Sequence, residues 1–451
     1  MTRNHQVIIC GAGITGVSAA YFLAKAGIKD ILLLDDRPPL TLTSDRSTEC
    51  YRNWWPDAEM LKLMNRSIDL MEQLADESGN VFRMNRRGYL YVTADEMKIP
   101  EWKEKLRQTS DLGGGPVRIH SSPDAGYQSS SIDGFYDQPD GIDLLLGTDL
   151  IHKHFPYLTD KTIAALHVRR AGWLSAQQMG MYLLESAYKL GVQFESAQVD
   201  AIDISNDSVR GIKLSTGAHL HCPIFVNAAG PYLKHVGNLL GINIPVQTEL
   251  HLKVVFKDHL GVVGRNAPLL IWDNPQLLPW GAEERSLLKS DPDSQWLTGP
   301  FPSGAHTRPE GSGESQSLLM LWEYRTQLME PVFPLPLDEQ YPEVTLRGLS
   351  TMLPGLREYF GRTLRSFVDG GYYVKTRENR LLAGPLPVQG AYVIGAVSGY
   401  GIMSACAAGE LLTSHIVENN IPSYAPAFSM ARYDDPEYQN KLDNWGESGQ
   451  L

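Results

Sequence analysis

The sequence contains little of what marks several large classes of protein. Only four of its 451 residues are cysteines, and their surroundings show neither a CxxC motif nor the spacing of a metal site. Lysine and arginine form no block, and the formal net charge is −12 at pH 7. We therefore predict reduced thiols, no bound metal and no nucleic-acid partner. The cysteines are Cys10, Cys50, Cys222 and Cys406.

Long apolar runs are also missing. No run approaches the ~18 residues of a membrane-spanning helix, and residues 1–6 contain no apolar secretory core. We therefore expect no membrane span and a cytoplasmic location. The hydrophobic content of 43% and the charged content of 20% are instead typical of a globular protein with a large core. The length favours two or three lobes.

The strongest motif lies near the start of the chain. A short apolar segment at 6–10 leads into a glycine-rich turn, residues with helical spacing follow at 17–26, and a second apolar segment at 31–34 ends at Asp35. This order predicts a βαβ unit of about 30 residues that binds a dinucleotide. The turn consists of Gly11, Ala12, Gly13, Ile14, Thr15 and Gly16.

Each glycine of this turn has a physical reason. Gly11 permits the tight turn, Gly13 lets a pyrophosphate approach the backbone, and Gly16 lets the helix pack closely on the strand. Amide groups at the helix start attract the negative charge, and Asp35 is placed to accept hydrogen bonds from the ribose. Asp36 is a further predicted contact of the cofactor. These residues do not distinguish FAD from NAD, although the N-terminal position of the motif in so long a chain favours FAD.

Later segments fit the same nucleotide. Hydroxyl groups at 43–48 can bind a phosphate or a ring edge, or belong to an ordinary surface loop. An apolar strand at 224–226 ends in small residues, and a glycine-rich turn precedes a predicted helix at 402–416 whose amide donors would face a flavin. The predicted contacts in these segments are Ser44, Ser47, Thr48, Val199, Ala228, Gly230, Gly399, Tyr400, Gly401, Ile402 and Met403.

The remaining pattern predicts a second, different sheet. Residues 57–79 have the spacing of a long amphipathic helix, and residues 81–93 suggest a hairpin-like pair of strands around Gly88. The alternation at 251–256 predicts a half-exposed strand. The Gly-, Pro- and Ser-rich region 274–317 predicts a long loop, of the kind that serves as a lid or a binding loop.

Four blocks in this order carry a family resemblance: GAGITG with Asp35, SDRST, FVNAAGPY, and YYVKTRENRLLAGP followed by GAYVIGAVSGYGIMSACAAGELL. The chain resembles the FAD-dependent amine and amino-acid oxidoreductases of the D-amino-acid oxidase superfamily, and most of all its sarcosine-oxidase, glycine-oxidase and dimethylglycine-dehydrogenase-like branch. The resemblance implies hydride transfer to flavin N5 from a carbon beside an amine nitrogen. The imine product then hydrolyses. The implied partners are a small amine substrate, resembling an amino acid or an N-methyl amino acid, and oxygen or another electron acceptor.

The implied fold is α/β, α+β overall. It combines a Rossmann-like FAD-binding domain of the glutathione-reductase type with a substrate domain on a mostly antiparallel sheet. We predict that the chain alternates between the two. The FAD-binding parts are 1–90, 171–240 and 361–430, the substrate parts are 91–170 and 241–360, and a polar tail occupies 431–451.

The sequence also departs from the family. Where some relatives attach FAD through a cysteine, this chain has Gly371, and the loop that carries a histidine in others holds Glu49 and Cys50. The resemblance therefore implies non-covalent FAD. The carboxylate-binding arginine of some members corresponds to Tyr373, and the lysine of the sarcosine-oxidase branch corresponds to Met403. The usual carboxylate anchor is missing from both positions.

Several residues are candidates for the substrate site, each with a structural alternative. Tyr373 occupies a position that faces the flavin in relatives, or is a core tyrosine; Lys375 shares its strand face. His306 could take a proton from the substrate and Arg308 could bind a carboxylate, or both are satisfied loop residues. Three further candidates are Arg52, which could bind a carboxylate or pair with a structural acid, and Lys253 or Lys257, either of which could promote the reaction with oxygen.

These observations leave more than one function open. The first hypothesis is a flavoenzyme that oxidises an amine C–N bond. The alternative is an FAD-binding assembly or scaffold protein with little turnover. A third hypothesis, an NAD-dependent enzyme, predicts a purified protein without yellow colour.

Overall fold

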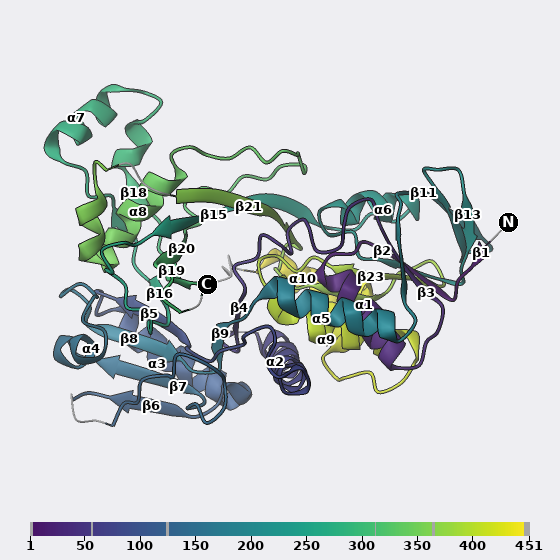
Figure 1. Ribbon diagram of the computed structural model, residues 1–451, viewed down its shortest axis with the longest axis horizontal. Helices are drawn as coiled ribbons and strands as arrows, with labels where there is room; N and C mark the ends of the chain where they lie inside the picture. Colours follow the sequence, from purple (N-terminus) through teal and green to yellow (C-terminus); the bar gives the residue numbers. More distant parts are fainter. Residues whose placement is uncertain (1–2, 56, 123–125, 312, 363–365, 446–451) are drawn as a thin grey trace.

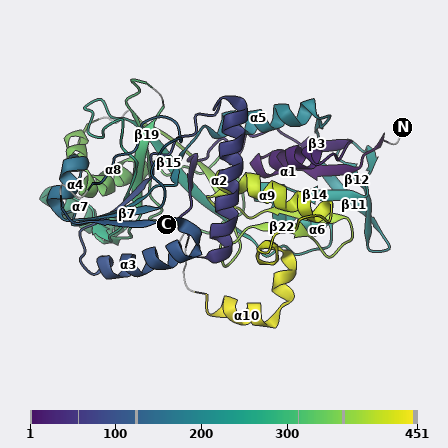
Figure 2. The same cartoon turned by 90° about the horizontal axis from the view of Figure 1, so that it is seen from below.

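The computed structural model describes residues 3–55, 57–122, 126–311, 313–362 and 366–445. Figure 1 shows an elongated molecule with one sheet system at each end, joined by two long strands that cross the middle. Figure 2 shows helix α2 (Ala58–Ser78) standing between the two ends. Asp57 caps α2 by accepting hydrogen bonds from two backbone amides, and Gly79 ends it with φ +67°. The helix predicted at 57–79 is confirmed.

The first sheet is six-stranded, and its central strands are apolar because both faces are covered. Alternate residues of β2 and β3 belong to separate core clusters on the two faces. All pairs are parallel except the last, between β23 and β22. The order is β10 (Gln193–Ser196), β3 (Ile31–Asp35), β2 (Val7–Cys10), β14 (Ile224–Asn227), β23 (Ala391–Gly395) and β22 (Leu382–Pro385).

One face of this sheet carries helices α1 (Ile14–Lys25), α5 (Ala176–Lys189) and α9 (Gly401–Ile416). The first and last helices pack closely, because Ser18 Oγ of α1 donates a hydrogen bond of 2.7 Å to the carbonyl of Ala405 in α9. The opposite face carries a four-stranded sheet and helix α6 (Leu233–Leu239). The order of the four strands is β1 (Arg3–Asn4), β13 (His219–His221), β12 (Ser208–Leu214) and β11 (Val199–Ser205).

The second large sheet is nine-stranded and mostly antiparallel, as predicted. Only the β16–β5 and β6–β7 pairs are parallel. The strands that cross the middle of the molecule are β21 and β15, at one edge (Figure 1). The order is β21 (Ser366–Lys375), β15 (Gln247–Lys257), β20 (Ser317–Leu321), β19 (Ala305–Glu310), β16 (Leu269–Trp272), β5 (Tyr89–Thr93), β8 (Ala164–Val168), β7 (Ile142–Leu146) and β6 (Val117–His120).

The remaining elements are short or peripheral. Helix α8 (Tyr341–Met352) packs its apolar side into the core of the nine-stranded sheet. Two small sheets pair β4 (Cys50–Arg52) with β9 (Ala171–Trp173) and β17 (Gln276–Leu277) with β18 (Pro300–Phe301). The other α-helices of the described residues are α3 (Lys98–Thr109), α4 (Thr148–His154), α7 (Ala282–Ser290) and α10 (Pro436–Asp443).

Two expectations from the sequence are wrong. Residues 81–88, all of them described, contain no strand; β5 begins at Tyr89 and pairs with the distant strands β16 and β8, so no local hairpin forms around Gly88. The region 274–317 is not one open loop, because it contains α7 and the buried central strand β19. In addition, β5 and β21 extend the nine-stranded sheet beyond the segment boundaries predicted at 90 and 361.

Candidate active site

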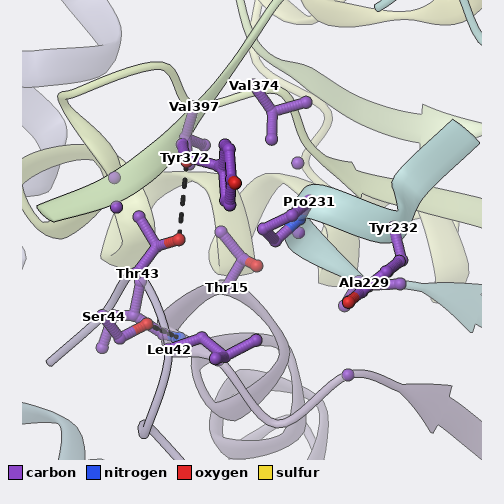
Figure 3. A pocket seen from close by; sticks show the side chains of 18 of the residues that line it. Thr15, Leu42, Thr43, Ser44, Ala229, Pro231, Tyr232, Tyr372, Val374 and Val397 are labelled. Carbon is purple, nitrogen blue, oxygen red and sulfur yellow. Dashed lines mark hydrogen bonds between the residues drawn. The ribbon is translucent and has the colours of Figure 1, made fainter. Parts of the chain in front are cut away.

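One large cavity lies where the two sheet systems meet. Its volume of about 470 Å³ falls in the range of small-molecule and cofactor sites. Gly13 and Gly401, from the starts of α1 and α9, both line it. Figure 3 shows Thr43 and Ser44 on one side of the cavity, Ala229 and Pro231 on the other. Two helix starts from opposite ends of the chain therefore serve one site.

The turn between β2 and α1 is built for a close approach of the backbone. Gly11 has φ +111°, and a Cβ on it would lie 2.3 Å from the carbonyl oxygen of Ala228. A Cβ on Gly16 would lie 1.9 Å from the carbonyl oxygen of Gly11, so only glycine lets the helix sit this close to the strand. Gly13 caps α1 and lines the cavity. This turn offers the backbone amides of a helix start to an anion.

An acidic pair marks the end of β3. Both Asp35 and Asp36 line the cavity. Asp35 accepts hydrogen bonds from the amides of Ala12, at 2.7 Å, and Arg37, at 3.0 Å. Burial raises the pKa of Asp35, the two amides oppose this effect, and the negative charge of Asp36 adds to it. Val199 lines the same cavity at the start of β11. These side chains suit a ribose and an adenine ring.

The loop at 41–48 ties the two sheet systems together across the cavity. Ser44 Oγ accepts a hydrogen bond of 2.9 Å from the amide of Ile14, in the first turn of α1. Thr43 Oγ1 donates to the carbonyl of Tyr372 in β21, a contact drawn in Figure 3. Lys253 Nζ of β15 donates a hydrogen bond of 2.9 Å to the carbonyl of Ser47. The loop is thereby held in a fixed position over the site.

The start of α9 is also precisely held. Ala396 and Ser398 adopt φ +55° and +44° in the turn before the helix, a conformation that costs energy for residues other than glycine. The amide of Ser398 donates a hydrogen bond of 2.9 Å to the carbonyl of Val374 in β21. Tyr400 lines neither cavity, since its hydroxyl bonds the carbonyl of Asn379 at 2.9 Å. It supports the helix start from within the core.

The residues present fit an FAD-sized dinucleotide with a negatively charged centre. A glycine turn, an acidic pair and a second helix start all face one hollow. Of the predicted contacts, Ala12 and Gly16 lie behind the surface of the cavity, and Met403 lines a smaller cavity next to it. The predicted residues that do line the large cavity are Gly11, Gly13, Ile14, Thr15, Asp35, Asp36, Ser44, Ser47, Thr48, Val199, Ala228, Gly230, Gly399, Gly401 and Ile402.

The smaller cavity, of about 50 Å³, adjoins the large one. The two are continuous, because six residues line both: Thr48, His251, Leu252, Leu321, Tyr373 and Gly399. The smaller cavity has charged and polar walls formed by Arg52, Tyr89, His306 and Glu323. A small molecule here would lie directly beside the occupant of the large cavity.

Arg52 is the most unusual residue of the smaller cavity. Its side chain is only 4% exposed and stacks near the rings of Trp55, at 4.9 Å, and Tyr89, at 5.7 Å. Within the described part of the chain, no carboxylate lies at ion-pair distance from its guanidinium, and its Nε has no hydrogen-bond partner. Its one side-chain hydrogen bond goes to the hydroxyl of Tyr91, at 3.3 Å. A buried cation without an acid is costly, and it forms a ready site for an anion.

A chain of charges lies opposite, on β15 and β21. His251 Nε2 is 3.0 Å from Glu249 Oε2 and its Nδ1 is 2.9 Å from Glu323 Oε1. Lys375 Nζ is 2.6 Å from the same oxygen of Glu249. The hydrogen bond from His251 is the main reason that the pKa of Glu249 falls to about 2. Burial lowers the pKa of His251, but the charges of Glu323 and Glu249 outweigh it and raise the pKa. The histidine thus lies between two carboxylates that favour its charged form.

Two further side chains complete the smaller cavity. The ring of Tyr373 stacks on that of His251, with centroids 3.7 Å apart and an interplanar angle of 12°. His306 Nδ1 lies 2.8 Å from the carbonyl oxygen of Gly304 and must donate its proton there. Burial lowers the pKa of His306. Its Nε2 is therefore an unprotonated acceptor in a residue that lines the cavity.

A comparison with protein-family models identifies the family of this chain. The model of the DAO family, described as FAD dependent oxidoreductase, matches residues 6–415. The chain belongs to this family. It is thus one of the FAD-dependent oxidoreductases that this model describes, as the sequence resemblance implied. No helix among the described residues is long and apolar enough to cross a membrane.

Individual relatives of this DAO-family chain are distant. It is 25% identical over 252 residues to the mitochondrial dimethylglycine dehydrogenase of Rattus norvegicus, covering 55% of this chain and 26% of that one. It is 24% identical over 269 residues to the mitochondrial pyruvate dehydrogenase phosphatase regulatory subunit of Mus musculus, covering 59% and 28%. The chain therefore matches about a quarter of the length of these relatives.

Among solved structures, the chain is similar in fold to the L-proline dehydrogenase of P. horikoshii. The TM-score is 0.73 at 18% identity, and the likeness covers 96% of this chain and 99% of the other. This similarity extends over both sheet systems, so the fold predicted from the sequence, an α/β FAD domain with a second domain, is confirmed.

The other predicted substrate-site residues of this DAO-family member lie apart from the smaller cavity. Arg308 is 1% exposed, and its guanidinium is 2.8 Å from Glu310, 3.2 Å from Glu49 and 2.9 Å from the carbonyl of Thr48. We therefore expect it to stabilise the loop rather than bind substrate. Lys257, at the exposed end of β15, lines neither cavity.

The lysine alternatives divide in the same way. Lys253 lines the large cavity, and burial lowers its pKa despite the nearby acids Asp369 and Glu49. Lys375 pairs with Glu249 and lines neither cavity. Of the two lysines considered for the reaction with oxygen, only Lys253 is therefore placed at the site.

The sequence analysis missed His251 and Glu323. His251 carried a usable signal, since it alternates with Lys253 on the strand predicted at 251–256, and period two places both on one face. Glu323 carried none, because it follows β20 in an irregular segment and only the folded chain brings it to His251.

Proposed function

We propose that this protein oxidises the C–N bond of a small amine that carries a carboxylate group, using non-covalently bound FAD. Arg52 is the observation that carries the proposal. It is a buried guanidinium without an acidic partner in the described chain, and it lines a small cavity continuous with the cofactor cavity. The carboxylate of the substrate would supply the missing partner in bidentate geometry.

Three residues of the chain have separate roles in this proposal. Arg52 binds and orients the carboxylate. His306 accepts the proton of the substrate amine at Nε2, because Nδ1 is committed to Gly304. Tyr373, fixed by its stacking on His251, forms the wall shared with the cofactor cavity. Together these residues would hold the carbon beside the uncharged nitrogen against the cofactor cavity, where bound FAD would supply a hydride acceptor. The imine then hydrolyses to a carbonyl compound and a smaller amine.

Gly371 and Cys50 support the proposal that FAD is held non-covalently. Gly371 has no side chain to link, and a Cβ there would lie 3.2 Å from Cγ2 of Thr43. Cys50 lines only the smaller cavity, and burial raises the pKa of its thiol, which keeps it unreactive. We expect acid precipitation to leave all the yellow colour in the supernatant; colour retained in the pellet would contradict this proposal.

The electron acceptor is oxygen or another oxidant. Lys253 favours oxygen, since it places a buried ammonium at the wall of the cofactor cavity, where positive charge promotes reaction with reduced flavin.

The test is an absorption spectrum of the purified holoenzyme under anaerobic conditions. N-methyl amino acids, glycine, proline and D-amino acids are added one at a time, and flavin bleaching within seconds identifies a substrate. The variant Arg52→Gln should lose at least about tenfold in affinity for the best substrate, the value of a charged hydrogen bond. Arg265→Gln is the control, because Arg265 bonds only backbone carbonyls outside both cavities. Equal affinity in Arg52→Gln and the control would contradict the assignment of Arg52.

A second candidate function is an FAD-binding regulatory or scaffold protein. The match to the mouse phosphatase regulatory subunit favours it. The same experiment separates the two, because the flavin of a scaffold should stay oxidised with every amine of the panel and still be reduced by light.

A further inference from the structure

Glu323 is a partly exposed carboxylate at the wall of the smaller cavity. It keeps 35% of its accessible area, and it lines the smaller cavity beside Arg52 and His306. The one ion pair that it makes in the described chain is with His251, through Oε1 at 2.9 Å. Its other carboxylate oxygen is thus free of an ion-pair partner, at a wall that a ligand would touch.

Glu323 is held in its ionised form. Burial would raise its pKa, but the positive charge of His251 outweighs this effect and lowers the pKa. Glu249 favours the charged form of His251 by binding its other nitrogen, and Glu249 is in turn fixed by Lys375. The charges of Glu249 and Lys375 cancel, as do those of His251 and Glu323. The four residues together therefore carry no net charge, although one of them presents a carboxylate to the cavity. Arg52 adds one positive charge.

We propose that Glu323 binds the ammonium group of the substrate and selects zwitterions. This inference rests on the proposed amine substrate and deepens it. A ligand with a carboxylate at Arg52 and a cationic nitrogen at Glu323 satisfies both walls. The cavity of about 50 Å³ restricts it to a small molecule, on the order of a few water volumes. His306, which lines the same cavity, is placed to receive the proton that this ammonium must lose before oxidation.

The same wall disfavours carboxylates that lack a cationic nitrogen. A ligand whose nitrogen is replaced by carbon leaves the Glu323 carboxylate buried against an apolar group, which costs desolvation without compensation. A ligand with a second carboxylate at that position meets like charge. Selectivity among small carboxylates should therefore depend on Glu323, whereas affinity for the carboxylate group itself depends on Arg52.

The test compares two ligands of the same shape, sarcosine and butanoate, in which a cationic nitrogen replaces a carbon. Dissociation constants are measured from the flavin spectrum of the anaerobic holoenzyme, by static titration or from the concentration dependence of flavin reduction. We expect the wild type to bind sarcosine at least about tenfold more tightly than butanoate. Glu323→Gln should reduce this preference to less than about threefold. Glu310→Gln, which removes a carboxylate of the same sheet outside both cavities, should keep it.

The outcomes separate this inference from the proposed function. Sarcosine that binds preferentially through Glu323 but leaves the flavin oxidised would sustain the inference and count against sarcosine oxidation. Reduction by sarcosine with an unchanged preference in Glu323→Gln would overturn the inference and leave the function standing. A wild type that binds butanoate as tightly as sarcosine, or binds neither ligand, overturns the inference without any variant. The inference can therefore be refuted even if Glu323→Gln does not fold.

Discussion

Two buried arginines in similar surroundings should respond in opposite ways to replacement by methionine. Arg52 and Arg308 are 4% and 1% exposed, and each stacks near an indole ring, at 4.9 Å from Trp55 and 5.1 Å from Trp173. Only Arg308 has acidic partners among the described residues. The contrast therefore isolates the effect of burying a charge with and without a counter-ion.

The magnitudes follow from these contacts. Arg52→Met loses two cation–π contacts of about 0.5–2 kcal/mol each and one hydrogen bond of about 1 kcal/mol. It also removes a desolvation penalty of several kcal/mol for an unpaired ion. We expect no net loss of stability, or a gain of about 1 kcal/mol. Arg308→Met leaves two carboxylates without their partner and should cost about 3–5 kcal/mol.

The assay is the thermal unfolding midpoint of the holoenzyme at fixed FAD concentration. Arg52→Met should unfold at or above the wild-type temperature, and Arg308→Met several degrees below it. Millimolar butanoate should raise the midpoint of the wild type but not that of Arg52→Met, because a ligand stabilises only the state that binds it. A fall in Arg52→Met as large as that in Arg308→Met would show that Arg52 has a structural counter-ion, and would refute the reasoning.

Three further predictions concern the cofactor and the chemistry. Gly13→Ala should fold, since φ is −72° and the added Cβ would lie 3.4 Å from Ser44 Oγ. In a fluorescence titration it should nevertheless bind FAD at least about tenfold more weakly. Gly16→Ala should fail to fold, and equal behaviour of the two variants would contradict the roles given to these glycines. Lys253→Met should slow reoxidation of the reduced flavin by oxygen in stopped-flow experiments while leaving anaerobic reduction unchanged; a slower reduction step would instead place Lys253 in substrate binding. Because burial lowers the pKa of His306 and its neutral form accepts the proton, kcat/KM should fall only as pH drops below about 6.5, and His306→Gln should lose this acidic limb.

The cofactor half of the site could be predicted from the sequence because its signals are local. The glycines of the first turn, the acid after the second strand and the late helix start each act within a few residues, and the turn chemistry that selects them does not depend on the rest of the fold. Gly16 shows this directly, since the atom nearest to a Cβ there is the carbonyl oxygen of Gly11 in the same turn.

The substrate half depends on contacts between distant segments, which one sequence does not reveal. Arg308 looked like a carboxylate ligand until the fold placed Glu49 beside it, 259 residues away in the chain. Nothing in the local sequence marks Glu323 as a site residue, because only the fold brings His251 of β15 to it. The region 274–317 read as a loop because proline and glycine are frequent there, yet β19 is stabilised by its buried place between β16 and β20.

The wall shared by the two cavities implies that FAD binds before the substrate. The smaller cavity, proposed above as the site of a carboxylate, opens into the large one along Tyr373 and Gly399. FAD held in the large cavity would form the wall on that side. Newly made chains should therefore acquire FAD before they can recognise a metabolite, and a cell short of riboflavin would accumulate a protein that neither turns over its substrate nor sequesters it.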